Sequence, residues 1–406
     1  MKKVIVIGAG ASGLIAAYFA ALRGNEVHVI EKNEKCGKKI YITGKGRCNI
    51  TNDILPEDFL PNVVTNSKFL TGCIYSFPPQ KLMSFLEEGG LRLKTERGSR
   101  VFPLSDKASD VTKCLENYCK SAGVSFHFNE KVEEIRVLHG TMSDVITDRS
   151  RYSCEACIVC TGGLSYPGTG STGDGYAFGR SVGHNIIGAV PALCGVNLSD
   201  SDLSALQGLS LKNVSLSVYY KKKKMRTFFG EMLFTHFGVS GPCVLSLSSI
   251  INRLDLKEVE IVVDLKPALD AATLDKRILR DFEKYKNKTI VNALIELLPK
   301  SLIPVVVKRS AVPADTPVNS IHKNQRESLN RTLKNFVLKP LSLRNIGEAI
   351  VTAGGIDVKE INPKTMESKL VKGLYFCGEV LDVDAFTGGY NLQIAFSTGY
   401  AAGNSV

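Results

Sequence analysis

Residues 4–31 read VIVIGAGASGLIAAYFAALRGNEVHVIE. A short β-branched run is followed at once by a glycine-rich turn, then by an apolar segment that stops at Gly24, then by a second apolar run. We expect a strand over 4–7, a helix from about Ala11 to Arg23 and a strand from Glu26 to Ile30. This order within about 30 residues predicts a dinucleotide-binding strand-turn-helix-strand unit.

Each glycine of the turn has a separate task in such a unit. Gly8 permits the tight turn, Gly10 lets the backbone approach a pyrophosphate, and Gly13 lets helix and strand pack closely. The helix N-terminus offers free N–H groups to phosphates, and Glu31 can accept both ribose hydroxyls. The cofactor-binding residues predicted here are Gly8, Gly10, Ala11, Ser12, Gly13, Glu31 and Lys32.

Two later segments are predicted to return to the same sheet. The run 156–160 leads into Thr161-Gly162-Gly163, and the run 373–377 leads into Gly378-Glu379. Asp382 and a helix from about Leu392 to Gly403 follow, so the end of the chain should complete the site that its beginning opens. The residues added to the cofactor set are Val132, Thr161, Gly162, Gly163, Gly355, Gly378, Glu379, Asp382, Gly389, Tyr390, Asn391 and Leu392.

A basic, glycine-rich segment follows Glu31. Lys38, Lys39 and Arg47 are placed to neutralise the phosphates, with a solvated loop as the alternative, and Asn49 could bond a ribityl or ring heteroatom. Cys48 is either redox active or a small packed residue.

A second motif, Gly168-Thr-Gly-Ser-Thr-Gly173, also has the GxGxxG spacing. Tyr166-Pro167 precedes it in place of a strand, and no acidic residue closes a second unit, so it predicts a loop that is either structural or close to the cofactor. A built-in nicotinamide domain is therefore not expected, and NAD(P)H would visit transiently.

Composition and charge limit the compartment, the metal content and the partners that are expected for the protein. Eleven scattered cysteines indicate reduced thiols in a cytoplasm. The side chains of Cys154, Cys157 and Cys160 would point to alternate faces of a strand and could not converge on a metal, so no metal is expected. No membrane span is expected either. The net charge of +11 permits an anionic partner, and the lysine run 221–224 is either a solvated hairpin tip or a contact for nucleic acid.

Several motifs together resemble the BaiN/YhiN-type NAD(P)/FAD-dependent oxidoreductases, also known as aminoacetone oxidase-type flavoproteins. They are 8–13 with 31–32, 37–39 with 43–49, 161–163 with 168–175, 233–242, 352–355 and 378–391, and they span nearly the whole chain in order. Lys45 stands where many relatives are expected to have glycine.

The resemblance implies non-covalent FAD in a Rossmann-like α/β domain of the two-dinucleotide-binding type, with an inserted antiparallel β-barrel and a small helical domain. We place the FAD domain at 1–190 and 346–406, the β domain at 191–270 and 339–345, and the helical insert at 271–338.

For function, the resemblance implies an FAD-dependent oxidoreductase. The leading hypothesis is NAD(P)H-driven reduction of an activated C=C bond in a small molecule or a nucleobase. The alternatives are reduction of uridine in ribosomal RNA and flavin-dependent oxidation of an amine such as aminoacetone. Candidate proton-transfer residues are His236, Tyr166 and Asp384.

Overall fold

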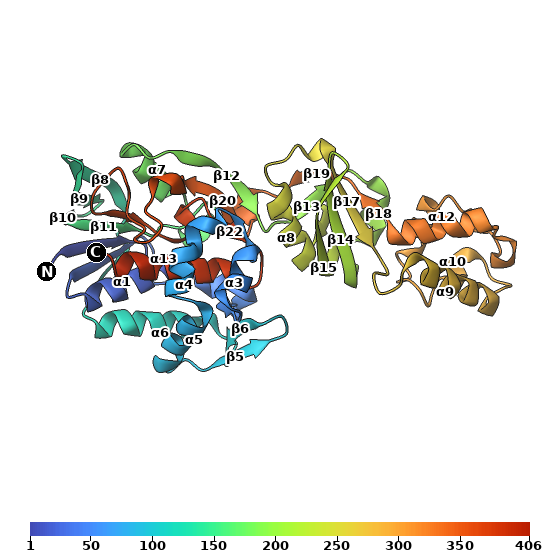
Figure 1. Cartoon of the computed structure of the whole chain (residues 1–406), viewed down its shortest axis with the longest axis horizontal. Helices are drawn as coiled ribbons and strands as arrows, with labels where there is room; N and C mark the ends of the chain where they lie inside the picture. The colour runs from blue at the N-terminus through green and yellow to red at the C-terminus, as the bar shows by residue number, and fades with distance from the viewer. The chain divides into compact units, whose positions relative to one another are not determined.

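The computed structural model describes the whole chain, residues 1–406. The chain divides into two compact units (Figure 1). Unit 1 comprises Met1–Ala192 and Asn345–Val406, and unit 2 comprises Leu193–Arg344.

Unit 1 is built on a five-stranded parallel sheet with the order β21-β11-β1-β2-β7. Its strands are β1 (Lys3–Ile7), β2 (Glu26–Glu31), β7 (Ser125–Phe128), β11 (Ala156–Val159) and β21 (Leu374–Phe376). The central strand β1 is apolar and buried on both faces, as the sequence predicts for a parallel strand. The segments before Thr161 and before Gly378 do return to this sheet, so its carboxyl ends gather three glycine-rich turns.

Two helices from opposite ends of the chain lie side by side, as Figure 1 shows: α1 (Ala11–Leu22) and α13 (Tyr390–Gly403). A β-carbon on Gly399 would lie 2.4 Å from the carbonyl oxygen of Ser12, and one on Gly403 would lie 2.5 Å from that of Ala16. The backbones touch because these glycines have no side chain, which fixes the last helix against the first.

Small antiparallel sheets flank the parallel sheet, with the orders β10-β9-β8, β3-β6-β5, β12-β20 and β22-β4. Their strands are β3 (Thr51–Asn52), β4 (Val63–Thr65), β5 (Leu93–Glu96), β6 (Arg100–Pro103), β8 (Val132–Leu138), β9 (Thr141–Thr147), β10 (Arg151–Ser153), β12 (Ile186–Ala192), β20 (Val351–Ile356) and β22 (Asp384–Ala385). The other helices of unit 1 are α2 (Lys38–Ile42), α3 (Pro56–Phe59), α4 (Thr71–Ser76), α5 (Pro79–Glu88), α6 (Ala108–Ser121) and α7 (Asp174–Ser181).

Unit 2 contains a seven-stranded antiparallel sheet with the order β18-β17-β14-β15-β16-β13-β19. Its strands are β13 (Val196–Leu198), β14 (Ser210–Tyr220), β15 (Lys223–Thr235), β16 (Gly238–Ser240), β17 (Val259–Asp264), β18 (Phe336–Leu338) and β19 (Pro340–Leu343). The expected barrel is not confirmed, because no ladder pairs β18 with β19 and the sheet stays open. Only Lys339 separates these two edge strands in the sequence, so the chain passes directly from one edge to the other.

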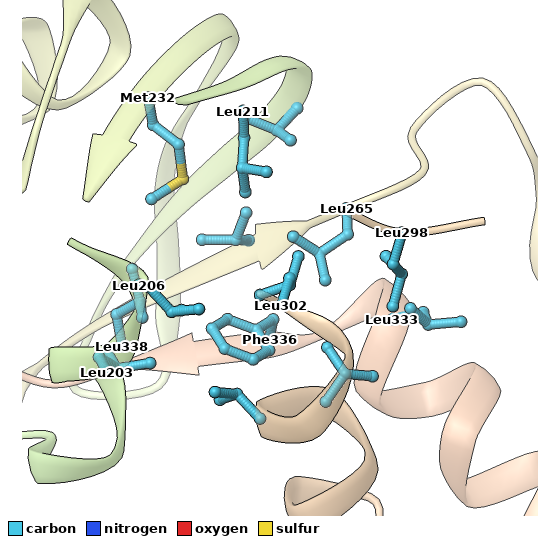
Figure 2. Packing of buried hydrophobic residues seen from close by; sticks show 14 of the residues in the cluster. Leu203, Leu206, Leu211, Met232, Leu265, Leu298, Leu302, Leu333, Phe336 and Leu338 are labelled. Carbon is cyan, nitrogen blue, oxygen red and sulfur yellow. The ribbon is translucent and has the colours of Figure 1, made fainter. Parts of the chain in front are cut away.

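The helices of unit 2 are α8 (Pro242–Ile251), α9 (Ala271–Lys284), α10 (Ile290–Ala293), α11 (Ile303–Arg309) and α12 (Lys323–Lys334). Strands and helices share a single buried cluster, in which Figure 2 shows Phe336 and Leu338 of β18 together with Leu302 and Leu333 of the helical segment. The helical insert and the β domain expected from the sequence therefore lie in one unit with one core. None of the helices in either unit has the length and apolar character needed to cross a membrane.

Candidate functional site

The turn after β1 contains three glycines with different surroundings. Gly8 has φ +101°, and a β-carbon on it would lie 2.7 Å from the carbonyl oxygen of Cys160. A β-carbon on Gly13 would lie 1.9 Å from the carbonyl oxygen of Gly8. Packing within the protein therefore demands both glycines. Gly10 is different, because its φ of −83° suits any residue and a β-carbon there meets nothing within 4 Å. Open space beside Gly10 is what a bound phosphate group requires.

The carboxylate of Glu31 holds this turn in place. Its Oε2 accepts the N–H of Ala9 at 2.8 Å, while Oε1 accepts the backbone N–H of Asn33 at 2.8 Å and its side-chain amide at 2.6 Å. Three of about four acceptor positions are used, which leaves one for a ribose hydroxyl. Val132, the first residue of β8, lies just after Glu130, whose N–H donates to the carbonyl of Glu31.

The second glycine motif folds over the same end of β2. Asn33 donates to the carbonyl of Thr169 at 3.1 Å, and Lys32 contacts the Thr172 hydroxyl at 2.5 Å and the Asp174 carboxylate at 2.6 Å. The motif begins within a short 3-10 turn, Pro167–Thr169, with no strand before it, and α7 follows it. It therefore forms a loop and not a second dinucleotide unit. Lys32 anchors this loop instead of standing free for the cofactor.

Glu379 connects four distant segments at the carboxyl edge of the sheet. Its Oε1 accepts the Ser165 hydroxyl and the Thr352 N–H, both at 2.8 Å, and its Oε2 accepts Lys39 Nζ at 2.5 Å. Lys39 and Glu379, both predicted site residues, are thus brought together as a cation–carboxylate ion pair with exposed side-chain fractions of 25% and 19%. The pair ties α2 to the loop that carries Thr161, Gly162, Gly163 and Tyr166.

The other predicted cations are also paired within the protein. Lys38 contacts Glu34 at 2.9 Å and Asn33 at 3.2 Å. Arg47 binds the carboxylates of Glu96 and Asp106 and covers the ring of Phe102 at 4.3 Å. The Arg47 hydrogen bond is the main reason that the pKa of Glu96 lies below its usual value. In contrast to these paired side chains, the N-termini of α1 and α13 are positive groups near the glycine-rich turns that no acidic side chain compensates.

The start of α13 is such a group. Gly389 caps this helix with φ +99°. No side chain bonds the first N–H groups of α13, and its first turn has no acidic residue. Helix α1 likewise has no side-chain cap and no acidic residue in its first turn. The side chain of Asn391 bonds the N–H and the carbonyl of Ala385 at 2.9 and 2.8 Å, which closes the turn before the helix. The backbone N–H groups of Tyr390, Asn391 and Leu392 stay free to meet an acceptor.

Backbone turns of the C-terminal segment pack too closely for side chains. A β-carbon on Gly378 would lie 2.7 Å from Ser12 Oγ, and one on Gly355 would lie 2.4 Å from the carbonyl oxygen of Val380. Asp382 is buried, and its carbonyl and carboxylate both accept from the Asn66 amide. The contacts with Ser12 and Asn66 join Gly378 and Asp382 to the N-terminal half of unit 1, whereas Gly355 packs β20 against the turn at Val380.

The cysteines are reduced and buried. Burial raises the pKa of the Cys48 thiol to about 12, so Cys48 is a protonated, packed residue at neutral pH. Cys154, Cys157 and Cys160 do not converge, and no group of three His, Cys, Asp or Glu side chains is arranged to hold a metal ion.

Three buried polar atoms of unit 1 have no partner within the protein. They are Asn49 Oδ1, Thr161 Oγ1 and Tyr176 OH. Burial, reinforced by the carboxylates of Glu379 and Asp382, raises the pKa of Tyr176 well above its usual value. Tyr176, Ser165 and Thr352 could not be foreseen as site residues, because nothing in the local sequence shows that α7, the loop at Ser165 and β20 approach Glu379.

The three candidate proton donors have different environments. Tyr166 is half-buried with φ +52°, a strained conformation for a tyrosine, directly after Ser165. Asp384 is fully buried in β22. His236 is exposed in the turn between β15 and β16 of unit 2, with its ring 5.1 Å from that of Phe237.

The family model for the HI0933-like protein Rossmann domain matches residues 2–405. The chain belongs to the HI0933-like family. This result confirms the resemblance drawn from the motifs.

Two relatives match this HI0933-like chain over almost their whole length. A 3-dehydro-bile acid delta(4,6)-reductase from Clostridium scindens is 31% identical, covering 100% of this chain and 99% of the relative. A ribosomal RNA dihydrouridine synthase from Haemophilus influenzae is 32% identical, with 99% and 98% covered. A solved 3-ketosteroid-delta4-(5alpha)-dehydrogenase from Rhodococcus jostii has a similar fold, with TM-score 0.54, 14% identity and coverage of 100% and 96%.

The HI0933-like chain is therefore a flavin-dependent oxidoreductase with a Rossmann-type FAD-binding fold. Its own residues fit the cofactor. Open space beside Gly10 would admit the pyrophosphate, the unpaired Asn49 and Thr161 oxygens would accept or donate hydrogen bonds, and two helix N-termini supply positive potential.

Proposed function

We propose that this enzyme uses NADH or NADPH to reduce a C=C bond conjugated to a carbonyl group. The observation that carries the proposal is the single dinucleotide unit of the chain: Gly168–Gly173 is a loop held by Lys32 and Asn33, so the nicotinamide has no domain of its own and must bind transiently. Both full-length relatives carry names of matching chemistry, because a delta(4,6)-reductase and a dihydrouridine synthase each add hydrogen across a conjugated C=C bond.

The reaction balances with a hydride and a proton. NAD(P)H leaves as NAD(P)⁺ after giving up a hydride, which ends on the carbon far from the substrate carbonyl, and a proton joins the neighbouring carbon. Bound FAD supplies the two-electron relay between the two substrates. We assign the proton to Tyr166, because its strained backbone and the contact of Ser165 with Glu379 hold its loop at the carboxyl edge of the sheet.

The remaining residues of the site bind and orient. Glu31 fixes the glycine-rich turn at the ribose end, and the free N–H groups at the start of α13 would face the negative charge of a reduced ring. The Lys39–Glu379 pair keeps the loops on either side of the site at a fixed separation.

A second candidate is reduction of uridine within RNA. It is favoured by the distribution of charge: unit 2 contains 24 basic and 14 acidic residues, whereas unit 1 contains 27 and 26. Ten of the eleven net positive charges therefore lie in the inserted unit, which matches a polyanionic substrate.

Anaerobic stopped-flow spectroscopy tests the proposal. NADH or NADPH should bleach the flavin of the purified enzyme, and a conjugated enone should restore its colour with formation of the saturated ketone. An enzyme that nicotinamides do not bleach would contradict the proposal, and bleaching by a small amine followed by peroxide release in air would support an amine oxidase in its place.

A further inference from the structure

The longest hairpin of unit 2 ends in a cluster of lysines. Strands β14 and β15 pair over almost their whole length, and Tyr220 pairs with Lys223, so Lys221 and Lys222 alone form the turn. Residues 210–235 contain six basic residues and one acidic residue. The sequence left two roles open for this run, a solvated turn or a contact for nucleic acid.

The conformation of the turn argues for a role beyond closing the hairpin. Lys221 and Lys222 have φ values of +49° and +65°, the left-handed conformation of a type I′ turn. Asn-Gly is the preferred sequence for such a turn, and lysine is disfavoured there because its β-carbon crowds the backbone. Two consecutive lysines therefore keep charge at the tip at the expense of local stability, and strain of this kind is typical of binding sites.

The lysine side chains are available to a partner. Lys221, Lys222, Lys223 and Lys224 are all exposed, and no ion pair engages them. The acidic residues nearest the tip in sequence register are Glu260 of β17 and Glu258, which ends the short 3-10 turn before that strand. The backbone N–H of Lys221 donates to the carbonyl oxygen of Glu258. Lys221 Nζ lies 5.4 Å from the ring centre of Tyr220.

Exposed apolar side chains continue the surface along β15. Met225 is 46% exposed and Phe229 is 62% exposed, while Ser217 and Thr227 bond each other across the hairpin at 2.9 Å. Lysines with neighbouring exposed aromatic and apolar groups are the combination that binds phosphates and stacks on unpaired bases.

We propose that the tip of the β14–β15 hairpin, residues 219–226, docks on the phosphate backbone of RNA. This inference deepens the second candidate of the proposed function and rests on it. Unit 2, which carries this hairpin, also holds ten of the eleven net positive charges, so a polyanion suits it better than a small neutral molecule does.

The test compares two variants by their affinity for a fluorescently labelled ribosomal RNA stem-loop, measured by anisotropy over a range of salt concentrations. Lys221→Asn/Lys222→Gly gives the turn its preferred sequence and removes two charges. Lys68→Gln/Lys364→Gln removes two exposed charges from unit 1 and serves as the matched control. Lys221→Arg/Lys222→Arg keeps the charge in the same turn.

We expect the Asn-Gly variant to melt at a higher temperature yet to bind the RNA roughly tenfold more weakly, with the slope of log affinity against log salt reduced by about 1.5. The Arg-Arg variant should retain binding. Equal losses in the Asn-Gly and unit 1 variants would overturn the proposal, since only total charge would then matter. Unchanged RNA affinity, or tighter capture by acidic lipid vesicles than by RNA, would overturn it as well.

The binding measurement needs no turnover. An enzyme that binds RNA through the hairpin but reduces no C=C bond would refute the proposed function and leave this inference standing. If the enzyme reduces a C=C bond but the Asn-Gly variant binds RNA as tightly as the wild type, the proposed function stands and this inference is refuted.

Discussion

Glu31 Oε2 lies 2.8 Å from the backbone nitrogen of Ala9, so the last residue of β2 holds the turn that follows β1. The same carboxylate binds Asn33, which in turn bonds the second glycine loop through Thr169. One buried side chain therefore sets the geometry of both loops at this edge of the sheet.

Glu31→Gln should weaken FAD binding and lower the free energy of unfolding by about 1–3 kcal/mol, because an amide cannot replace all three accepted hydrogen bonds. Titration of FAD into the apoprotein and urea denaturation measure the two effects. Glu26→Gln, at the exposed start of the same strand, is the control. It should leave FAD affinity unchanged and affect unfolding only slightly, because its pairs with His28 and Lys3 are solvent-exposed. Full flavin affinity in Glu31→Gln would contradict this role.

Tyr176→Phe should have opposite effects on the apoprotein and on the loaded enzyme. The buried hydroxyl has no partner within the protein, so its removal should stabilise the apoprotein by about 1 kcal/mol. Flavin or substrate binding should weaken if a bound group is the missing partner. Tyr118→Phe is the matched control, because its hydroxyl donates to the Phe85 carbonyl at 2.6 Å and its loss should destabilise both forms.

Tyr166→Phe should slow reduction of the C=C substrate by about 10²-fold or more, because the proton would have to come from water. Single-turnover kinetics separates this step from bleaching by NAD(P)H, which requires no proton from Tyr166. His236→Asn and Asp384→Asn test the rival donors. A large loss in His236→Asn beside a normal rate in Tyr166→Phe would transfer the role to the histidine.

Asp202 predicts a pH dependence of stability in unit 2. Its carboxylate accepts Arg309 Nε and Nη2, both at 2.8 Å, and the Arg309 hydrogen bond is the main cause that lowers the pKa of Asp202. The pKa of Asp202 is thus lower in the folded than in the unfolded protein. The stabilisation by its charge is therefore complete above the unfolded-state pKa of about 3.9, and it is lost as the pH falls through the folded-state pKa.

Asp202→Asn should therefore cost about 1–3 kcal/mol at pH 7, and the difference from the wild type should shrink below about pH 4. Urea denaturation of both proteins from pH 7 to below about pH 4 measures this difference in the free energy of unfolding. Asp315→Asn, an exposed residue with no ion pair, should show no such convergence. A constant deficit at every pH would mean that the Asp202 charge is not the source.

The sequence predicted the opening unit closely because its signals are local. The helix expected over 11–23 is α1 at Ala11–Leu22, and the strand expected over 26–30 is β2 at Glu26–Glu31. Apolar periodicity fixes the type of each element, and Gly8 and Gly24 mark where the chain turns. The last helix begins at Tyr390, two residues earlier than expected, because Gly389 adopts φ +99° and caps it.

The partners of the predicted site residues could not be foreseen. Lys39 and Glu379 are 340 positions apart, and Arg47 meets Glu96 and Asp106 through the packing of β5 and β6 beside it. Charge and proximity to the glycines predicted phosphate contacts for these cations, but the fold surrounds them with carboxylates. Whether the sheet of unit 2 closes is also a non-local property, because its edge strands β18 and β19 pair with β17 and β13 from distant parts of the chain.

The affinity of Gly10→Ala for FAD shows most directly whether the first glycine-rich turn holds the cofactor. It is measured by calorimetric titration, together with the melting temperature of the apoprotein. A β-carbon at Gly10 meets no protein atom within 4 Å, so the apoprotein should melt as the wild type does, while FAD binding falls by at least about tenfold because the methyl group occupies the space of the pyrophosphate. Unchanged FAD affinity with an unchanged melting temperature would contradict the assignment of this turn to the cofactor.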